Sequence, residues 1–314
     1  MEMTVLSPGP LTTVQDLGRP GHRRHGVASG GAMDAFALRV ANLLVGNAGA
    51  AAALEFALTG PRLKFSGDAL VALCGVGFGD LPDWRLARVP AGGVLSLEKC
   101  RAGCRGYLAV AGGLDVPLVL GGRGTDLRGG FGGHEGRVLR AGDVLKVQRG
   151  ALEAHTLRPD AALHHFVAPE IRPAYSRSPV VRVVRGAEAE EFLGDFFKQA
   201  FTLEAHSDRM GLRLAGPPIG RRGQQELVSS PVAPGTIQVP PDGQPIVLMA
   251  DAQTLGGYPK IAHAISVDLP LLAQLRPGDT VHFDEVEPGE AHRLWLAREH
   301  ALALLGEGLA GKLR

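Results

Sequence analysis

The segment Leu139-Arg140-Ala141-Gly142-Asp143-Val144 recurs later in the chain as Leu275-Arg276-Pro277-Gly278-Asp279-Thr280. A second pair, Asp115-Val116-Pro117-Leu118 and Asp268-Leu269-Pro270-Leu271, repeats in the same order. Internal repetition over segments of this length predicts two related structural units. We therefore expect a first lobe at 1–150, a linker over 151–177, a second lobe at 178–288, and a C-terminal helix and tail over 289–314.

The first copy carries extra residues between its two repeated segments. This surplus falls in Gly121–Gly136, where eight glycines crowd together. Glycine lets backbone N–H groups approach a ligand closely, and Arg123 and Arg128 add positive charge. A flexible surface loop and a ligand-binding loop are both compatible with this composition.

Short apolar runs dominate the rest of the chain, for example Ala69–Leu73 and Val180–Val184. They have the length of strands, are rich in Val and Leu, and are separated by turns drawn from 44 Gly and 22 Pro. The pattern predicts a mainly β protein with a few short helices.

Three segments have helical character. Asp34–Val45 places apolar residues on one face and is followed by Gly46, a typical C-terminal stop. Glu188–Phe197 is a shorter candidate. The last predicted helix covers about 290–305, where Leu294, Ala301 and Leu305 are expected to be buried.

Composition excludes several classes of function. The formal net charge of +1 gives no general electrostatic reason to bind nucleic acid or an anionic membrane. We find no secretion signal and no apolar run near the ~20 residues of a membrane span, so a soluble, cytoplasmic protein is expected. Cys74, Cys100 and Cys104 are too few and too unevenly spaced for a disulfide framework or a zinc site, and no metal is predicted.

Cofactor motifs are missing from the sequence. There is no G-x-x-x-x-G-K-[ST] phosphate loop and no biotin-attachment sequence. If ATP or biotin takes part in the reaction, another chain is expected to carry it.

Polar residues instead concentrate in turns rich in Gly and Pro, a common way to build a small-molecule pocket. Asp34 directly precedes the first predicted helix, where it can cap the helix or lie beside an anion site at the free N–H groups. The other polar residues of these turns include Gln15, Asp16, Arg19, Arg209, Gln238, Asp251, Gln253 and Tyr258.

Taken together, these stretches resemble the urea-amidolyase-related, biotin-dependent carboxyltransferase family, known as KipA, PxpC or the 5-oxoprolinase C subunit and similar to allophanate hydrolase subunit 2. The resemblance spans nearly the whole chain, in order, although Leu255 stands where the family often has Thr. It rests on Gly9–Gly21, Gly30–Asp34, Ala41–Asn47, Arg128–Gly133, Ser207–Gly211, Ile237–Pro245 and Gln253–Pro259.

The resemblance implies two tandem cyclophilin-like β-barrel lobes. It also implies two partner subunits, one KipI-like and one LamB/YcsF-like, in a complex that opens 5-oxo-L-proline to L-glutamate using ATP. In fused relatives the same module moves CO₂ from carboxybiotin to urea, which leaves a carboxyltransferase as an alternative. A third alternative is a non-catalytic antagonist that binds a KipI-like inhibitor of a sensor kinase.

Candidate site residues follow from the substrate, a small amide or lactam. Arginine suits a carboxylate or a developing phosphate, glutamine orients an amide, and Asp or Tyr handles protons. Arg209→Ala and Asp34→Ala are expected to abolish turnover and leave folding intact. The expected catalytic residues are Asp34, Arg209, Asp251 and Tyr258, and the expected substrate-binding residues are Gln15, Asp16, Arg19, Arg123, Arg128, Gln238 and Gln253.

Overall fold

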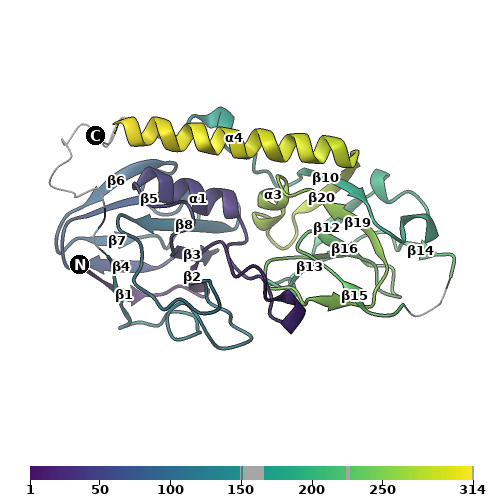
Figure 1. Ribbon diagram of the computed structural model, residues 1–314, viewed down its shortest axis with the longest axis horizontal. Helices are drawn as coiled ribbons and strands as arrows, with labels where there is room; N and C mark the ends of the chain where they lie inside the picture. Colours follow the sequence, from purple (N-terminus) through teal and green to yellow (C-terminus); the bar gives the residue numbers. More distant parts are fainter. Residues whose placement is uncertain (149, 151–165, 224–226, 313–314) are drawn as a thin grey trace. The chain divides into compact units, whose positions relative to one another are not determined.

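The computed structural model describes residues 1–148, 150, 166–223 and 227–312 (Figure 1). Its described residues form two compact units. The first unit comprises those in Met1–Arg19, Gly30–Pro173 and His300–Arg314, and the second those in Pro20–Ser29 and Ala174–Glu299.

The bounds of the two units differ from those that the sequence repeat predicts, because each unit includes a short segment from the other half of the chain. Pro20–Ser29 belongs to the second unit, although residues on both sides of it belong to the first. Most of the predicted linker, residues 151–165, lies outside the described residues. The repeat-based domain bounds remain a prediction.

Two antiparallel sheets form the first unit (Figure 1). The strand orders are β7-β4-β1-β9 and β2-β3-β8-β5-β6. The bounds are β1 Glu2–Ser7, β2 Thr12–Gln15, β3 Ala53–Ala57, β4 Arg62–Phe65, β5 Ala69–Gly75, β6 Arg85–Val89, β7 Val94–Ser96, β8 Arg105–Val110 and β9 Val144–Lys146.

The five-stranded sheet contains the core of the first unit. Every residue of β5 and β8 is buried, which explains why β5 is a continuous apolar run and why β8 becomes one from Tyr107 onward. Helix α1 (Ala35–Leu44) packs against β5, β6 and β8 and buries Phe36, Val40 and Leu44. The helix predicted over 34–45 is therefore confirmed.

A closed barrel of seven strands forms the second unit, in the order β10-β19-β16-β17-β13-β12-β20. Alternate residues of β10, β12, β13 and β20 are buried, as expected for strands with one face toward the barrel core. With this barrel the mainly β fold class is confirmed. The bounds are β10 Val180–Arg185, β12 Ala200–Leu203, β13 Gly211–Ala215, β16 Thr236–Gln238, β17 Ile246–Leu248, β19 Lys260–Ala264 and β20 Thr280–Glu285.

The remaining short elements lie outside the two sheets and the barrel. Two ladders of two strands each and several short helices belong to the second unit, except η2, which belongs to the first. They are β11 Phe192–Leu193 with β14 Gly220–Arg221, β15 Ser230–Pro231 with β18 Leu255–Gly256, α3 Leu269–Ala273, and the 3₁₀ helices η1 Arg23–His25, η2 Pro169–Ile171, η3 Ala189–Glu191 and η4 Phe196–Lys198.

The helix predicted over Glu188–Phe197 is wrong. The segment forms η3, then β11, and only begins η4 at Phe196. Gly194 has a φ of 86°, which interrupts any helix at this point. Phe196 is buried against Phe283 at 4.8 Å between ring centroids, so packing in the barrel core determines this conformation.

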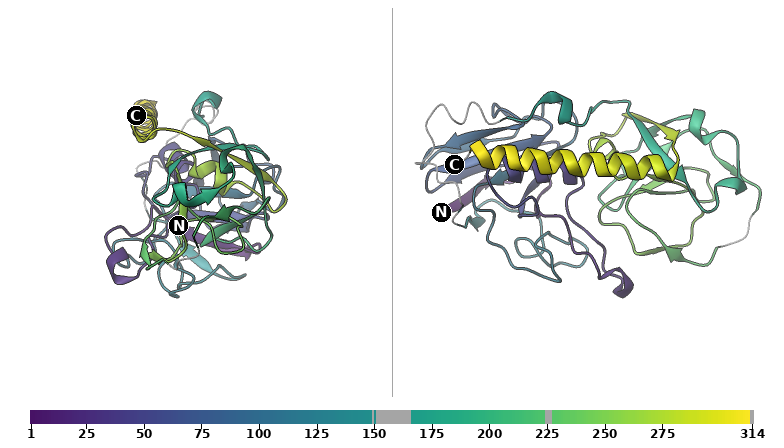
Figure 2. Two further views of the ribbon diagram at one scale, coloured as in Figure 1. Left: turned by 90° about the vertical axis from the view of Figure 1, so that its right-hand side faces the viewer. Right: turned by 45° about the horizontal axis from the view of Figure 1, so that its top comes forward.

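The C-terminal helix α4 covers Pro288–Lys312 and is continuous (Figure 2). It begins near the predicted start but extends past the predicted stop at Gly306 and through Gly308, since each glycine within a helix costs only about 1 kcal/mol. Its buried side chains include Leu302 and Leu309, while the three side chains expected to be buried are only partly so: Leu294, Ala301 and Leu305. Among the described residues, no helix has the length and apolar character needed to cross a membrane.

The Gly-Asp turns of the sequence repeat have the same geometry in both units. In the first unit the Val5 N–H donates to the Asp143 carbonyl at 2.8 Å, and in the second the Leu203 N–H donates to the Asp279 carbonyl at 2.8 Å. Each Asp carboxylate accepts the N–H three residues earlier, at 2.7 and 2.9 Å. The repeat found in the sequence is thus a repeat of local structure.

Candidate functional site

Buried polar groups meet at the start of α1 in the first unit. Asp34 Oδ1 accepts the Ala37 N–H at 2.9 Å, which makes Asp34 the N-cap of the helix. The Asp34 N–H donates to the Tyr107 hydroxyl at 2.8 Å, and this hydroxyl donates to Glu55 Oε2 at 2.8 Å. The Met33 N–H also donates to Glu55 Oε2, at 2.9 Å. Asp34 therefore caps the helix, which was one of its two predicted roles. It does so as part of a hydrogen-bond network with Tyr107 and Glu55.

The network keeps Tyr107 protonated. Burial raises the pKa of the Tyr107 phenol well above its ordinary value, and the negative charges of Glu55 and Asp34 raise it further. The phenol therefore remains a hydrogen-bond donor to Glu55 across the physiological pH range.

Neither Glu55 nor Tyr107 is a candidate from the sequence alone. They lie directly opposite each other on β3 and β8, a pairing that only the sheet register creates. One signal was present, because Glu55 is the single charged residue in the otherwise apolar stretch Ala53–Ala57. A charged residue in a strand buried along its whole length usually has a specific partner.

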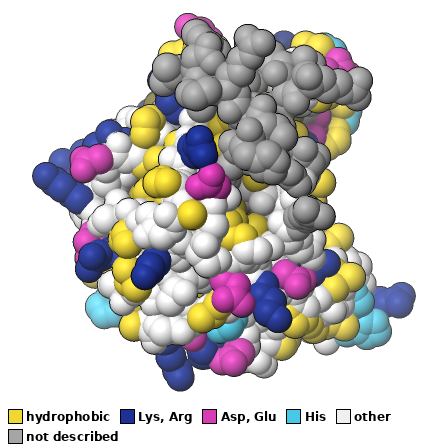
Figure 3. Space-filling view, turned by 90° about the vertical axis from the view of Figure 1, so that its left-hand side faces the viewer, with side chains coloured by type: hydrophobic (Ala, Val, Ile, Leu, Met, Phe, Trp, Pro, Cys, Tyr) yellow, Lys and Arg dark blue, Asp and Glu magenta, His cyan; other side chains and the backbone are white. Residues whose placement is uncertain are grey.

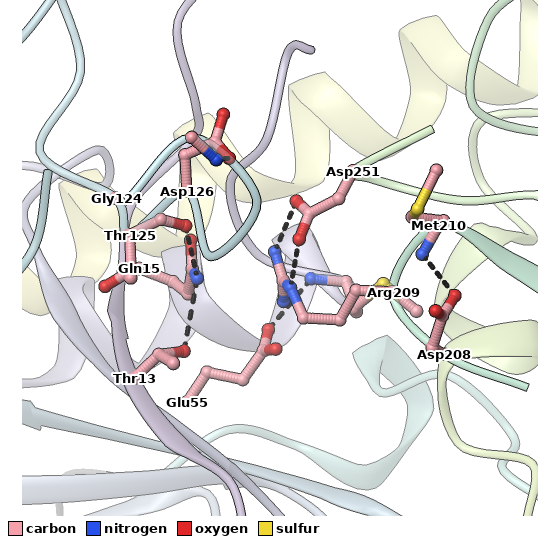
Figure 4. Close-up of polar contacts among 12 residues, drawn as sticks. Thr13, Gln15, Glu55, Gly124, Thr125, Asp126, Asp208, Arg209, Met210 and Asp251 are labelled. Atoms are coloured by element: carbon pink, nitrogen blue, oxygen red, sulfur yellow. Dashed lines mark hydrogen bonds and ion pairs between the residues drawn. The ribbon is translucent and has the colours of Figure 1, made fainter. Parts of the chain in front are cut away.

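The end of β2 and the Gly-rich loop, residues 121–136, hold several predicted site residues (Figure 4). Gln15 Nε2 donates to Thr13 Oγ1 at 3.1 Å and to the Thr125 carbonyl at 3.2 Å. Asp16 accepts the Gly18 N–H at 2.7 Å and the Arg123 N–H at 2.5 Å. Gln15 and Asp16 therefore fasten the loop to the strand.

Arg19 is fully buried beneath the same loop. Its Nη2 donates to the Gly124 carbonyl, and its guanidinium lies 4.9 Å from the centre of the Phe131 ring. Nε is 3.5 Å from the Val119 carbonyl, which makes at most a weak hydrogen bond. The contacts of Arg19 are thus with neutral groups.

The other two arginines of the loop lie differently. Arg123 is partly buried, and its side chain donates to the carbonyl of Val116. Arg128 is exposed. The structure therefore brings Gln15, Asp16, Arg19 and Arg123 together and leaves Arg128 on the surface.

The Gly-rich loop is packed rather than loose. The Thr125 N–H donates to the Val14 carbonyl at 2.9 Å, so the loop continues the hydrogen bonding of the edge strand β2. Gly132 has a φ of 71°, and a Cβ there would lie 2.2 Å from the Gly124 carbonyl oxygen. Glycine is required here because the backbone packs closely against itself.

In the second unit Arg209 and Asp251 form a bidentate ion pair (Figure 4). Arg209 Nε lies 2.7 Å from Asp251 Oδ2, and Nη2 lies 3.0 Å from Oδ1. The Arg209 side chain is 5% exposed and that of Asp251 15%. Next to the pair, Asp208 Oδ1 accepts the Met210 N–H at 2.8 Å, which fixes the turn. Two predicted catalytic residues are thus direct partners.

The remaining candidates of the second unit surround the β15–β18 ladder. Gln238 is buried and its Nε2 donates to the Tyr258 carbonyl at 3.2 Å, while the Tyr258 side chain is exposed. Gln253 is partly buried, and its carbonyl lies 3.5 Å from Arg23 Nη2, which also donates to the Val232 carbonyl. Arg23 is not a candidate from the sequence, because nothing local predicts that 20–29 packs on the second unit.

The surface of the first unit is electrostatically mixed. On the face in Figure 3, Lys and Arg side chains alternate with Asp and Glu and with hydrophobic groups, consistent with the net charge of +1. Within the described part of the chain, no group of three or more His, Cys, Asp or Glu side chains could hold a metal ion.

Comparison with known proteins gives matches along nearly the entire chain. The family model for the carboxyltransferase domain, subdomain A and B, matches residues 25–285. The chain is 41% identical to the 5-oxoprolinase C subunit of Escherichia coli (strain K12) and 40% identical to that of Haemophilus influenzae, in each case over 92% of this chain and 93% of the relative. The solved structure of Kluyveromyces lactis urea carboxylase superposes with a TM-score of 0.87 at 30% identity, over 98% of this chain but only 29% of that one.

Proposed function

This chain belongs to the carboxyltransferase-domain family, subdomain A and B, and from this we propose that it is the C subunit of an ATP-dependent 5-oxoprolinase complex. The complex would open 5-oxo-L-proline to L-glutamate. One observation carries the proposal: the relatives named as 5-oxoprolinase C subunits match this chain over 93% of their own length, whereas it spans less than a third of the urea carboxylase.

The proposed substrate needs an enzyme because its lactam is a planar amide of low reactivity. Ring opening places negative charge on the amide oxygen, and donors fixed in advance stabilise that charge most effectively. We assign this role to Arg209. Asp251 accepts hydrogen bonds from Nε and Nη2 of the Arg209 guanidinium and so holds that side chain in one orientation.

The other catalytic candidates have weaker support. Tyr258 is exposed and accessible to a substrate or a partner chain, which agrees with a proton-handling role. Asp34 already accepts the Ala37 N–H as a helix cap, so its proposed effect on turnover acts through the position of α1. Gln238, which is expected to bind substrate, would act through the loop that carries Tyr258, since it donates to the Tyr258 carbonyl.

ATP would be used at the level of the complex rather than bound by this chain. Its proposed partners are one KipI-like and one LamB/YcsF-like protein, and support comes from relatives that are named as subunits.

A carboxyltransferase acting on a urea-like amide is the second candidate. The superposition on urea carboxylase favours it, since nearly the whole of this chain corresponds to one segment of that larger protein. In this case biotin would be carried by a separate protein, as this chain has no attachment sequence.

The deciding experiment measures glutamate released from 5-oxo-L-proline and ATP by this chain co-purified with its KipI-like and LamB/YcsF-like partners. Omitting this chain is the control. We expect glutamate only when all three proteins are present. Folded, associated proteins that release none would overturn the proposal, and carboxybiotin with urea would then be the next substrates to test.

A further inference from the structure

One side of helix α4 is exposed over about four turns (Figure 2). At about 100° per residue, the exposed residues of this side fall within an arc of about 120°. The buried Leu302 and Leu309 lie on a different side of the helix. We call the exposed side the α4 face, and it consists of Arg293, Leu296, Ala297, His300, Ala303, Leu304 and Glu307.

The α4 face has a palindromic order of residue types. His300 lies at its centre. In each direction from His300 there is an alanine after three residues, a leucine after four and a charged residue after seven. The two charged residues are of opposite sign, Arg293 toward the N-terminus and Glu307 toward the C-terminus. Because the face lies on one continuous helix, this spacing follows from helix geometry alone.

Such an order makes the α4 face complementary to itself. In a two-fold symmetric contact the same patch is used by both copies, and residue i of one copy meets residue j of the other. With the two helices antiparallel and the axis at His300, Leu296 lies level with Leu304 of the partner subunit. Ala297 lies level with Ala303 of the partner subunit, and Arg293 with Glu307 of the partner subunit. Every residue of the face therefore meets one of suitable chemistry.

The charges favour this antiparallel arrangement. Glu307 forms no ion pair with any other described residue, and the positions three and four residues from it along the helix are Ala, Leu or Gly. Arg293 is 71% exposed and pairs with Glu290 at 2.6 Å, but an exposed pair of this kind contributes little. Both charges are therefore available to a second copy. A parallel pair of helices would instead place like charges at the same level.

The apolar residues of the α4 face suit close packing of two helices. Leu296 and Leu304 are 49% and 54% exposed, so both have apolar surface to bury. Ala297 and Ala303 are small and allow the two helix axes to approach to the lower end of the usual 8–10 Å. Isolated exposed leucines are normal on a protein surface. Here the leucines lie between charges arranged for self-association. One helix pair is a small contact beside the ~1,200 Å² of a standard interface, so the expected association is weak.

We propose that the α4 face binds the α4 face of a second copy of this chain, with the two helices antiparallel across a two-fold axis at His300. The proposal is independent of the proposed function, because it involves neither substrate nor the other subunits.

The test is sedimentation velocity of the full chain alone, over a roughly thousandfold range of concentration. We expect the dimer fraction to rise with concentration. Leu304→Gln removes both leucine contacts of a dimer and should raise the concentration at half-dimerisation roughly tenfold or more. The matched control is Leu118→Gln, which replaces a 63% exposed leucine outside α4 and should leave dimerisation unchanged.

Reversal of the charges tests the register. Glu307→Arg places like charges at both ends of the helix pair, and Arg293→Glu does the same, so each should weaken the dimer roughly tenfold. The double variant Arg293→Glu/Glu307→Arg restores opposite charges at both ends and should dimerise within about threefold of the wild type. Rescue of this kind requires that the two residues meet across the interface.

Three outcomes would overturn the proposal. The first is a chain that stays monomeric at every concentration. The second is a dimer that keeps its affinity in both Leu304→Gln and Glu307→Arg, since it would use another surface. The third is a monomeric chain whose KipI-like partner no longer binds Leu304→Gln, since the face would then belong to that partner. If Leu304→Gln does not fold, as judged by circular dichroism, the charge variants decide. Dimerisation by the α4 face without glutamate release in the complex would support this proposal and reject the proposed function.

Discussion

Tyr107 and Glu55 are a cross-strand pair in which the phenol donates to the carboxylate at 2.8 Å, with Tyr107 fully buried and Glu55 3% exposed. The same phenol accepts the N–H of Asp34, the cap of α1. A single hydroxyl group therefore links the central sheet of the first unit to its helix.

Removing that hydroxyl group should lower stability. Tyr107→Phe removes one acceptor from the Asp34 N–H and one donor from Glu55, so we expect a loss of about 1–3 kcal/mol in the free energy of unfolding. Urea denaturation of this chain measures it. Tyr258→Phe is the control, because that side chain is 47% exposed and its loss should change stability by less than about 0.5 kcal/mol. Equal effects of the two variants would contradict the structural role of Tyr107.

The Arg209–Asp251 pair predicts strong coupling between two substitutions. Arg209→Met leaves a mostly buried carboxylate without this partner, and breaking a buried pair costs about 3–5 kcal/mol. We expect the lower end of that range because Asp251 is 15% exposed. The double variant Arg209→Met/Asp251→Leu should recover much of the loss in a double-mutant cycle, while turnover by the complex stays abolished. Strictly additive losses in stability would mean that the pair is energetically unimportant.

Stability at low pH should depend on Asp143. The hydrogen bonds from Arg137 lower the pKa of Asp143 from 3.8 to about 2. A carboxyl whose folded-state pKa is lowered stabilises the fold above its unfolded pKa, and this contribution is lost as the pH falls through the folded value. We therefore expect the loss between about pH 4 and pH 2. Asp143→Asn should be less stable at pH 7 and show a shallower decline across that window, whereas the exposed control Asp80→Asn should follow the wild type.

Two glycines of the Gly-rich loop offer a matched comparison. Gly121 and Gly132 have similar φ angles of 80° and 71°, but a Cβ at Gly121 meets nothing within 4 Å. Gly121→Ala should therefore cost only the conformational strain, about 1–2 kcal/mol. Gly132→Ala adds a collision with the Gly124 carbonyl and should cost clearly more in thermal unfolding. Similar costs would mean that the loop moves aside easily.

The local sequence predicted those features of the structure that depend on residues near one another in the chain. The Gly-Asp turns of Asp143 and Asp279, the cap at Asp34 and the glycine stop after α1 all follow from short-range chemistry. The structure revises the expectation that Asp34→Ala and Arg209→Ala leave folding intact, because Arg209→Ala breaks the ion pair with Asp251. Asp34→Ala removes a helix cap and should cost about 1 kcal/mol of stability rather than leave folding untouched.

Long-range pairing explains what the sequence did not predict. Glu55 and Tyr107 meet only through strand register, and Arg209 meets Asp251 across two separate turns. The helix expected over 188–197 does not form, because Phe196 packs in the barrel core against Phe283. A pattern in the local sequence does not predict such a long-range contact. The individual roles of the candidate site residues remain predictions until the variants are measured.

The exchange of segments between the units limits how this protein can be dissected. The chain passes from one unit to the other at residues 19–20, 29–30, 173–174 and 299–300. A recombinant fragment beginning at 174 lacks Arg23, whose guanidinium donates to the Val232 carbonyl. A fragment ending at 173 lacks the buried Leu302 and Leu309 of α4. Expression of either half by itself should yield aggregated or protease-sensitive material, so the two halves marked by the repeat are not independent folding domains.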